Sequence, residues 1–251
     1  MNVKLLSLVV PAYKQEKTIA EDIKNLNRIL YSLRFKYEIL VVVDGFVDKT
    51  YDVLLKLKSE IPNLEVLGYE ENCGKGSAIK YGVEKAKGDI IGFIDAGMDI
   101  DPSELAIMLD LMDWNDADII LGSKLHPESK VNYPFSRRIL SWGYRTLTKA
   151  LFGFNVKDTQ VGFKFFKKKV AKDVFSRIIV KRFAFDVEVL TVAYKLGYHK
   201  IFEAPVKIDF RGANSITSRN FWRVIYLMLW DTAAVFYRLK ILHYYDKDIK
   251  R

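Results

Sequence analysis

The feature that most constrains this chain is a series of short, continuously apolar runs, each followed by a helical pattern. The runs occupy residues 5–11, 37–43, 64–69, 89–94 and 117–122. An uninterrupted apolar run of this length is typical of a strand buried on both faces of a parallel sheet. Apolar residues recur at helical spacing over about 18–32, 49–59, 74–86 and 102–113. The alternation predicts a doubly wound α/β fold with a mostly parallel sheet flanked by helices.

The second half of the chain is less regular. Helical patterns cover about 135–151, a stretch from 168, 185–196 and a long aromatic-rich stretch over 220–244, and strands are expected after 158 and over 200–210. A chain of 251 residues, half of them apolar, can bury one large core. We therefore expect one α/β domain over residues 1–218 and a C-terminal amphipathic helical segment over residues 219–251.

Charge is distributed unevenly along the chain, although the net charge is only +9. Residues 1–123 carry a net charge of −7 and residues 124–182 a net charge of +12. A basic middle segment indicates an anionic partner, either nucleic acid, a membrane surface or a phosphorylated substrate. No nucleic-acid partner is expected, because no recognised nucleic-acid module occurs and the acidic front would repel a duplex. The lone Cys73 excludes an internal disulfide framework and a cysteine-based zinc site.

Acidic residues stand where predicted strands end, at Asp44, Asp95 and Asp99. Carboxylates gathered at the carboxyl ends of strands suit a hard divalent cation, which in turn neutralises a diphosphate. The same residues would also serve as turn or helix-cap residues, and composition does not separate the two interpretations. Residues 74–76 match neither the P-loop nor the dinucleotide glycine template. They remain a glycine-rich entry to a helix, which either approaches a phosphate or turns the chain.

A series of short motifs gives the chain a resemblance to family 2 glycosyltransferases with the GT-A fold. In order, they are VPAY at 10–13, VVDG at 42–45, NCGKG at 72–76, DA at 95–96 and GSK at 122–124. Later motifs resemble the polyprenyl-phosphate branch, comprising dolichol-phosphate mannose and glucose synthases and bacterial polyprenyl-phosphate glycosyltransferases. These are Arg137 with Ser141, DTQVGFK at 158–164, FDVE at 185–188 and EAPV at 203–206.

The resemblance implies a role for each matching residue. The expected nucleotide-sugar site comprises Pro11, Ala12, Tyr13, Gln15, Glu16, Val42, Asp44, Lys75, Asp95, Ala96, Lys124 and Arg211. The acceptor phosphate would meet Arg137, Arg138 and Ser141. Asp95 and Asp99 would bind Mg²⁺ or Mn²⁺, and Asp158 and Asp95 would be the catalytic residues.

The metal motif departs from the family pattern. The second aspartate of the usual DxD motif is Gly97 here, and Asp99 stands two residues further on. Asp99 could replace the lost ligand, because oxygen ligands two residues apart on one loop can reach one ion. Alternatively, the site binds metal weakly and the protein is a degenerate transferase. Lys124 stands where the family usually has arginine.

The implied activity is an inverting hexosyltransferase that moves a hexose from UDP or GDP to a polyprenyl or dolichyl phosphate. An acceptor phosphate is already ionised at neutral pH, so no strong general base is required, and the basic segment would bind the phosphate. Two alternatives stay open. One is a family 2 transferase acting on a saccharide or protein hydroxyl, and the other is a degenerate nucleotide-sugar-binding protein.

From the sequence we expect neither a signal peptide nor a membrane span. The pattern over 220–244 is interrupted by Arg223, Asp231 and Arg238, so it cannot cross a bilayer. Its aromatic residues beside arginine and lysine suit a helix lying in the headgroup layer. We expect a cytoplasmic protein with peripheral contact to the cytoplasmic membrane face. The alternative is a helix packed on the catalytic domain or in a homo-oligomer interface.

Overall fold

The core of the protein is a seven-stranded, mostly parallel sheet, as predicted. The computed structural model describes residues 3–97, 100–131, 135–154, 156–182, 184–208 and 221–246. The strand order is β3-β2-β1-β4-β7-β5-β8. The strands are β1 (Leu5–Ala12), β2 (Lys36–Asp44), β3 (Leu64–Tyr69), β4 (Ile90–Ile94), β5 (Ile119–Ser123), β7 (Phe163–Lys167) and β8 (Ile201–Pro205).

One strand of this sheet runs against the others. β7 lies between β4 and β5 and pairs antiparallel with both, whereas β1–β2, β2–β3, β1–β4 and β5–β8 are parallel pairs. The N-terminal end of β7 therefore meets the carboxyl ends of β4 and β5. Ligands bind beyond the carboxyl ends of strands in such sheets, so the loop before β7 enters the ligand-binding edge.

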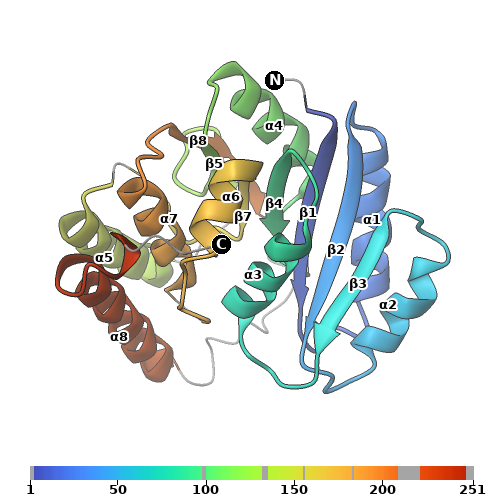
Figure 1. Cartoon of the computed structure of the whole chain (residues 1–251), viewed down its shortest axis with the longest axis horizontal. Coiled ribbons are helices and arrows are strands. Elements are labelled where there is room, and N and C mark those ends of the chain that lie inside the picture. Colours follow the sequence, from blue (N-terminus) through green and yellow to red (C-terminus); the bar gives the residue numbers. More distant parts are fainter. Residues whose placement is uncertain are drawn as a thin grey trace.

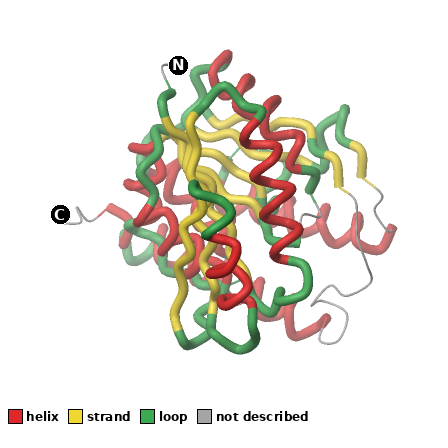
Figure 2. Tube along the Cα trace, turned by 90° about the vertical axis from the view of Figure 1, so that its right-hand side faces the viewer, coloured by secondary structure: helices red, strands yellow, loops and turns green. Residues whose placement is uncertain are grey.

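Helices cover both faces of the sheet (Figures 1 and 2). One core cluster lies between the sheet and α1 (Ile19–Tyr31), α2 (Thr50–Lys58) and α4 (Leu105–Trp114). The other lies under α3 (Lys75–Lys85), α6 (Lys168–Phe175) and α7 (Phe185–Lys195). Successive residues of β1 point to opposite clusters, with Leu8 and Val10 in the first and Val9 in the second. Burial on both faces explains the uninterrupted apolar sequence of the strand.

The strand expected over 200–210 is interrupted. β8 ends at Pro205, which is the last residue paired with β5, and the Val206 N–H then donates to the Ser129 hydroxyl. The chain continues as β9 (Lys207–Ile208), which pairs with β6 (Lys130–Val131) in a separate two-stranded sheet. The prediction of one continuous strand was wrong because the alternating pattern continues across the point where the chain leaves the large sheet.

The C-terminal helix α8 (Phe221–Lys240) lies beside α5 (Phe135–Phe152), at the side of the molecule away from α1 and α2 (Figure 1). Val235 is fully buried, and the Tyr144 and Thr232 hydroxyls are 2.8 Å apart between the two helices. Burial raises the pKa of Tyr144 to about 12, so its hydroxyl remains protonated at neutral pH. No helix in the described ranges has both the length and the apolar character needed to cross a bilayer.

A buried carboxylate fixes the end of the chain to the domain. Glu188 of α7 is completely buried and accepts hydrogen bonds from the N–H groups of Ile179 and Val180 at 2.9 and 2.6 Å. It also accepts the Tyr245 hydroxyl and the Arg238 guanidinium, the latter at 3.2 Å. Burial, together with the Glu188 carboxylate, raises the pKa of Tyr245, so the phenol stays protonated and donates. A charged group is tolerated here because every acceptor position has a donor.

We expect Glu188→Gln to lower the free energy of unfolding by about 2–4 kcal/mol, because the amide cannot accept all of these hydrogen bonds and leaves Arg238 without its counter-charge. Urea denaturation followed by circular dichroism measures the change. The control is Glu60→Gln, which removes an exposed ion pair with Lys24 and should cost less than about 1 kcal/mol. Equal losses in the two variants would contradict the assigned role of Glu188.

Candidate active site

The ends of β2, β1 and β4 are neighbours, and they bring the expected donor residues to one edge of the sheet. Asp44 ends β2, Tyr13 and Gln15 follow β1, and Asp95 follows β4. Parallel neighbouring strands place their carboxyl ends side by side, so residues from distant parts of the sequence meet there. The structure therefore brings the N-terminal motifs together at one edge of the sheet.

Asp44 is buried and uses its carboxylate to hold the glycine-rich loop. It accepts the Cys73 N–H at 2.7 Å, the Gly74 N–H at 2.9 Å and the Asn72 side-chain amide at 2.9 Å. The Gly76 N–H donates to the carbonyl of Lys181 at 2.9 Å. These N–H groups are engaged within the protein, so the loop turns the chain and fixes the start of α3.

Lys75, the first residue of α3, forms an ion pair with Asp95. Lys75 Nζ lies 2.6 Å from Asp95 Oδ1, and the two side chains are 34% and 42% exposed. Burial alone would lower the pKa of Lys75, but Asp95 and Asp186 together outweigh burial and raise it. Lys75 is thus protonated and lies against the Asp95 carboxylate.

Gly162 forms the surface against which the Asp95 carboxylate rests. A Cβ atom at Gly162 would lie 2.1 Å from Asp95 Oδ2, and the Asp95 N–H donates to the Gly162 carbonyl at 3.1 Å. Only glycine can therefore stand at position 162 while Asp95 keeps this rotamer. At Gly97 the backbone has φ +92°, a region that L side chains rarely adopt, so an aspartate there would be strained.

A second, more deeply buried ion pair lies near the first. Lys164 Nζ contacts Asp186 Oδ1 and the Val161 carbonyl at 2.5 Å each, and the Lys164 side chain has no exposed surface. Burial lowers the pKa of Lys164, an effect that Asp186 opposes. Asp186 also raises the pKa of Lys75, so it joins the two pairs electrostatically.

The turn after β1 contains the remaining expected donor residues. Tyr13 is 37% exposed, and the Gln15 Oε1 atom is buried with no hydrogen-bond partner among the described residues. Gln15 Nε2 lies 3.7 Å from the position of a Cβ at Gly97, so this side chain adjoins the Asp95 loop. Glu16 accepts the Lys49 N–H at 3.1 Å. Val42 is fully buried in the core, and its backbone lies in the sheet between β1 and β3, so neither is exposed to a ligand.

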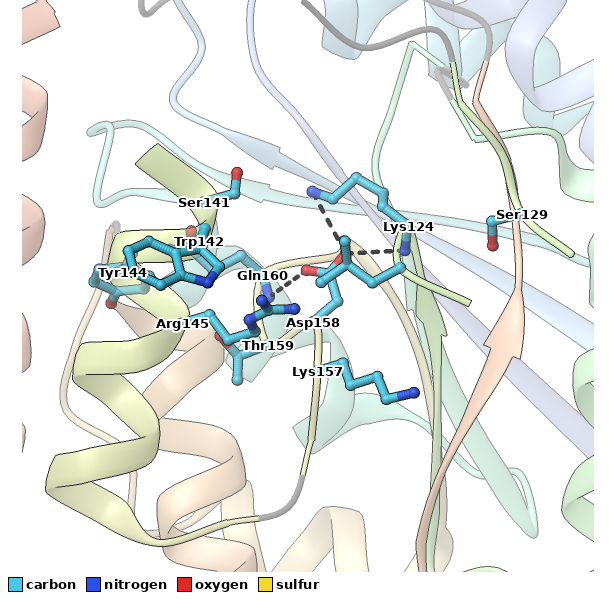
Figure 3. A pocket seen from close by; sticks show the side chains of 11 residues that line it. Lys124, Ser129, Ser141, Trp142, Tyr144, Arg145, Lys157, Asp158, Thr159 and Gln160 are labelled. Atoms are coloured by element: carbon cyan, nitrogen blue, oxygen red, sulfur yellow. Dashed lines mark hydrogen bonds and ion pairs between the residues drawn. The ribbon is translucent and has the colours of Figure 1, made fainter. Parts of the chain in front are cut away.

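A cavity of about 500 Å³ opens beside α5 and the end of β5 (Figure 3). Its lining residues are Lys124, Leu125, Ser129, Ser141, Trp142, Tyr144, Arg145, Lys157, Asp158, Thr159 and Gln160. Three cationic side chains and one carboxylate thus share its wall. Arg145 reaches from α5 on one side of Asp158 and Lys124 from the end of β5 on the other (Figure 3). A surplus of positive charge in a concave site favours an anionic ligand.

Asp158 is nearly buried and well ordered by its neighbours. It accepts the Lys124 N–H at 2.9 Å, and Lys124 Nζ lies 3.8 Å from the same oxygen. The Asp158 N–H donates to Glu203 Oε1 at 3.0 Å, which ties the loop to β8. Lys124 and Asp158 are therefore a coupled pair at the cavity wall.

Several expected site residues cannot be placed. Asp99 and Arg211 lie outside the described residues. Arg137 and Arg138 belong to α5, but their side chains are likewise outside the description.

The other expected site residues are described. Ala96 follows Asp95 directly in the turn after β4, and Pro11 and Ala12 end β1. Ser141 lines the cavity.

The sequence does not predict that Trp142, Arg145 and Lys157 line the cavity, or that Gly162 supports Asp95. Arg145 could have been found, because it lies four residues after Ser141 on a predicted helix and so shares its face. Lys157 directly precedes Asp158, but nothing in the local sequence indicates that it lines the cavity.

The residues present are compatible with a divalent cation. Among the described residues, no three His, Cys, Asp or Glu side chains form a ligand cluster. A Mg²⁺-like ion in a phosphate-binding site needs only one or two carboxylates, because phosphate oxygens and water complete its coordination. The half-exposed Asp95 carboxylate would supply such an oxygen ligand. Asp95 is the described residue that would hold the ion.

Comparison with known proteins identifies the class. Residues 7–175 match the glycosyl transferase family 2 model, so the chain belongs to that family, as its motifs indicated. It is 36% identical over 211 residues to dolichyl-phosphate beta-glucosyltransferase ALG5A of Trichomonas vaginalis, covering 80% of this chain and 65% of that protein. It is 32% identical over 205 residues to the dolichyl-phosphate beta-glucosyltransferase of Dictyostelium discoideum, covering 76% and 63%. The chain thus spans just under two thirds of these relatives.

The fold matches solved GT-A structures. Glucosyl-3-phosphoglycerate synthase from Mycobacterium tuberculosis, solved with Mn²⁺, UDP and phosphoglyceric acid, superposes with a TM-score of 0.68. The two chains are 17% identical, and the match covers 93% of this chain and 78% of that one. The predicted GT-A fold is confirmed, and its sheet order places the expected donor residues at the ligand-binding edge.

We expect Gly162→Ala to weaken Mn²⁺-dependent binding of UDP at least tenfold, because the new methyl group displaces the Asp95 carboxylate. Isothermal titration with UDP and Mn²⁺ measures the loss, and a thermal melt checks that the fold persists. Gly143→Ala is the matched control, since a Cβ there meets no atom within 4 Å. Undiminished binding by the Gly162 variant would show that Asp95 does not serve the nucleotide site.

Proposed function

We propose that the protein transfers glucose from UDP-glucose to a dolichyl or other polyprenyl phosphate, with inversion at the anomeric carbon. The observation that carries the proposal is the cationic cavity around Asp158 in a family 2 glycosyltransferase whose loop 158–162 also places Gly162 against Asp95. The names of the relatives support glucose, a β-linked product and dolichyl phosphate. The UDP bound by the structural neighbour supports UDP over GDP as the donor nucleotide.

The donor would lie across the ends of β1, β2 and β4. Tyr13 and Gln15 would contact the nucleotide, and Asp95 would hold Mg²⁺ or Mn²⁺ at the diphosphate. A bound divalent cation supplies Lewis acidity, which stabilises the charge that develops on the leaving diphosphate. Arg211 and Asp99 keep their proposed donor and metal roles from the family resemblance, as do Ala96 and Glu16.

The acceptor phosphate would enter the cavity. An ionised phosphate oxygen attacks the anomeric carbon, the bond from that carbon to the β-phosphate oxygen breaks, and UDP leaves with the electron pair. No proton has to be removed from the nucleophile, so Asp158 is needed mainly to order Lys124 and the loop. Lys124, Arg145 and Lys157 would neutralise the incoming phosphate, together with Arg137, Arg138 and Ser141.

The test is formation of a glucosylated lipid from labelled UDP-glucose and dolichyl phosphate.

We expect Arg145→Met to raise the KM for dolichyl phosphate roughly tenfold without changing the KM for UDP-glucose, because one charge-assisted contact to the phosphate is lost. Lys149→Met is the matched control. Lys149 lies one turn further along α5, is exposed, and does not line the cavity.

Other outcomes would replace the proposal. Glucose transfer to a saccharide or protein without added lipid phosphate would favour a hydroxyl acceptor. Tight UDP binding with no turnover, even with a lipid extract, would favour a nucleotide-sugar-binding protein that has lost catalysis. Product from GDP-mannose but not from UDP-glucose would reassign the donor.

We also propose that residues 219–251 form a peripheral membrane contact, with the catalytic domain at a cytoplasmic membrane face. Large aromatic side chains on α8 are exposed, among them Trp222 at 78% and Trp230 at 64%. Tyr226 stacks near Trp230 with ring centroids 6.3 Å apart. Exposed tryptophan and tyrosine suit the headgroup layer, where one part of the side chain is apolar and the other hydrated. The unpaired Cys73 agrees with a reducing compartment.

We expect the double variant Trp222→Ser/Trp230→Ser to lose at least tenfold in affinity for vesicles of phosphatidylcholine and phosphatidylglycerol, since two large apolar groups no longer leave water. Vesicle sedimentation measures the loss. Trp114→Ser is the control, because Trp114 is 88% exposed but ends α4 on the other side of the sheet. An oligomeric wild-type protein that becomes monomeric in the double variant would instead identify α8 as a homo-oligomer interface.

A further inference from the structure

We propose that Lys75 is an exchangeable counter-ion of the donor site. It neutralises Asp95 while no metal is bound, and it moves to the diphosphate when a divalent cation occupies Asp95. The inference rests on the proposed function, in that the donor is a nucleoside diphosphate sugar. It predicts that metal and nucleotide bind cooperatively. Lys75 competes with the metal for Asp95 when the metal binds alone, and it pairs with the diphosphate when both ligands bind.

Lys75 lies against the carboxylate that is expected to bind the metal. Its Nζ atom lies 2.6 Å from Asp95 Oδ1, on the carboxylate that the DxD motif assigns to the metal. An ammonium group and a divalent cation cannot both occupy the near side of one carboxylate oxygen, because they would repel each other strongly at that separation. Metal binding at this oxygen therefore requires Lys75 to move.

The surroundings determine which of the two residues can move. Asp95 is held on the sheet side by Gly162, against which its carboxylate rests, and by the hydrogen bond from its N–H to the Gly162 carbonyl. The backbone at Lys75 is fixed by the loop that Asp44 anchors, but its long side chain is 34% exposed. The Lys75 side chain can thus rotate while the Asp95 carboxylate stays in place.

The charge balance of the site supplies the reason for the exchange. Lys164 neutralises Asp186 in the buried pair, and Lys75 neutralises Asp95 in the half-exposed one. A divalent cation alone would leave this set of four side chains with excess positive charge. A diphosphate that arrives with the cation removes the excess and gives the displaced ammonium an anionic partner. The full gain in binding free energy is therefore realised only when both ligands are present, which is positive coupling between them.

The test measures Mn²⁺ affinity by titration calorimetry, first without nucleotide and then with saturating UDP. In the wild-type protein we expect UDP to tighten Mn²⁺ binding. In Lys75→Met we expect Mn²⁺ without UDP to bind roughly three- to tenfold more tightly, because its competitor for Asp95 is gone. UDP in the presence of Mn²⁺ should bind about tenfold more weakly, so the coupling between the ligands falls. A merely structural ion pair would not produce these opposite changes.

Two further variants keep the result interpretable. Lys75→Arg retains the charge, so it should bind Mn²⁺ without UDP as weakly as the wild-type protein does. This variant remains informative even if Lys75→Met unfolds. Lys85→Met, at the exposed end of the same helix, should change neither affinity. Unchanged or weaker Mn²⁺ binding by a folded Lys75→Met variant overturns the inference, while UDP binding with Mn²⁺ in the wild type leaves the proposed donor intact. A wild-type protein that binds neither ligand refutes the proposed function and the inference together.

Discussion

The antiparallel insertion of β7 between β4 and β5 is the constraint on which the site depends. Because β7 runs against its neighbours, the loop before it arrives at the edge where parallel strands present their carboxyl ends. That loop carries Asp158 into the wall of the cavity and Gly162 under the Asp95 carboxylate. A parallel strand in the same place would have put its preceding loop at the opposite edge. The cationic cavity and the expected metal residue are thus connected through one loop of five residues, 158–162.

The two ion pairs differ in burial, and we infer different roles for them. Lys164 has no exposed surface and contacts both Asp186 and a backbone carbonyl, so removing it would leave a carboxylate without a partner. Lys75 and Asp95 are both more than a third exposed, and water can solvate either one when they part. A pair of this kind contributes little to stability, so its separation costs little. The buried pair is therefore suited to holding the site in shape, and the half-exposed pair to exchanging partners with a ligand.

The sequence was sufficient to predict the fold and the position of Asp44 and Asp95 at one edge of the sheet, because both follow from local patterns. Continuous apolar runs identify strands buried on both faces, and Asp44 and Asp95 stand where those runs end. The basic segment was harder to interpret, because its lysines contact residues that are distant in the sequence. Lys172 donates to the carbonyls of Val83, Glu84 and Ala86, more than 80 residues away, and Lys167 pairs with Asp116. Only tertiary structure separates these structural lysines from the few cations that line the cavity.

The C-terminal helix and the glycine-rich loop share one support. Glu188 binds Arg238 of α8 on one side and the N–H groups of Ile179 and Val180 on the other, and the carbonyl of Lys181 accepts the Gly76 N–H. The helix is therefore attached to the body of the domain through the same segment that borders the start of α3. If α8 lies on a bilayer as proposed, this attachment fixes the orientation of the whole domain. Because α5 lies beside α8 and forms part of the cavity wall, the cavity would then lie next to the helix that contacts the layer in which phosphorylated lipid headgroups reside.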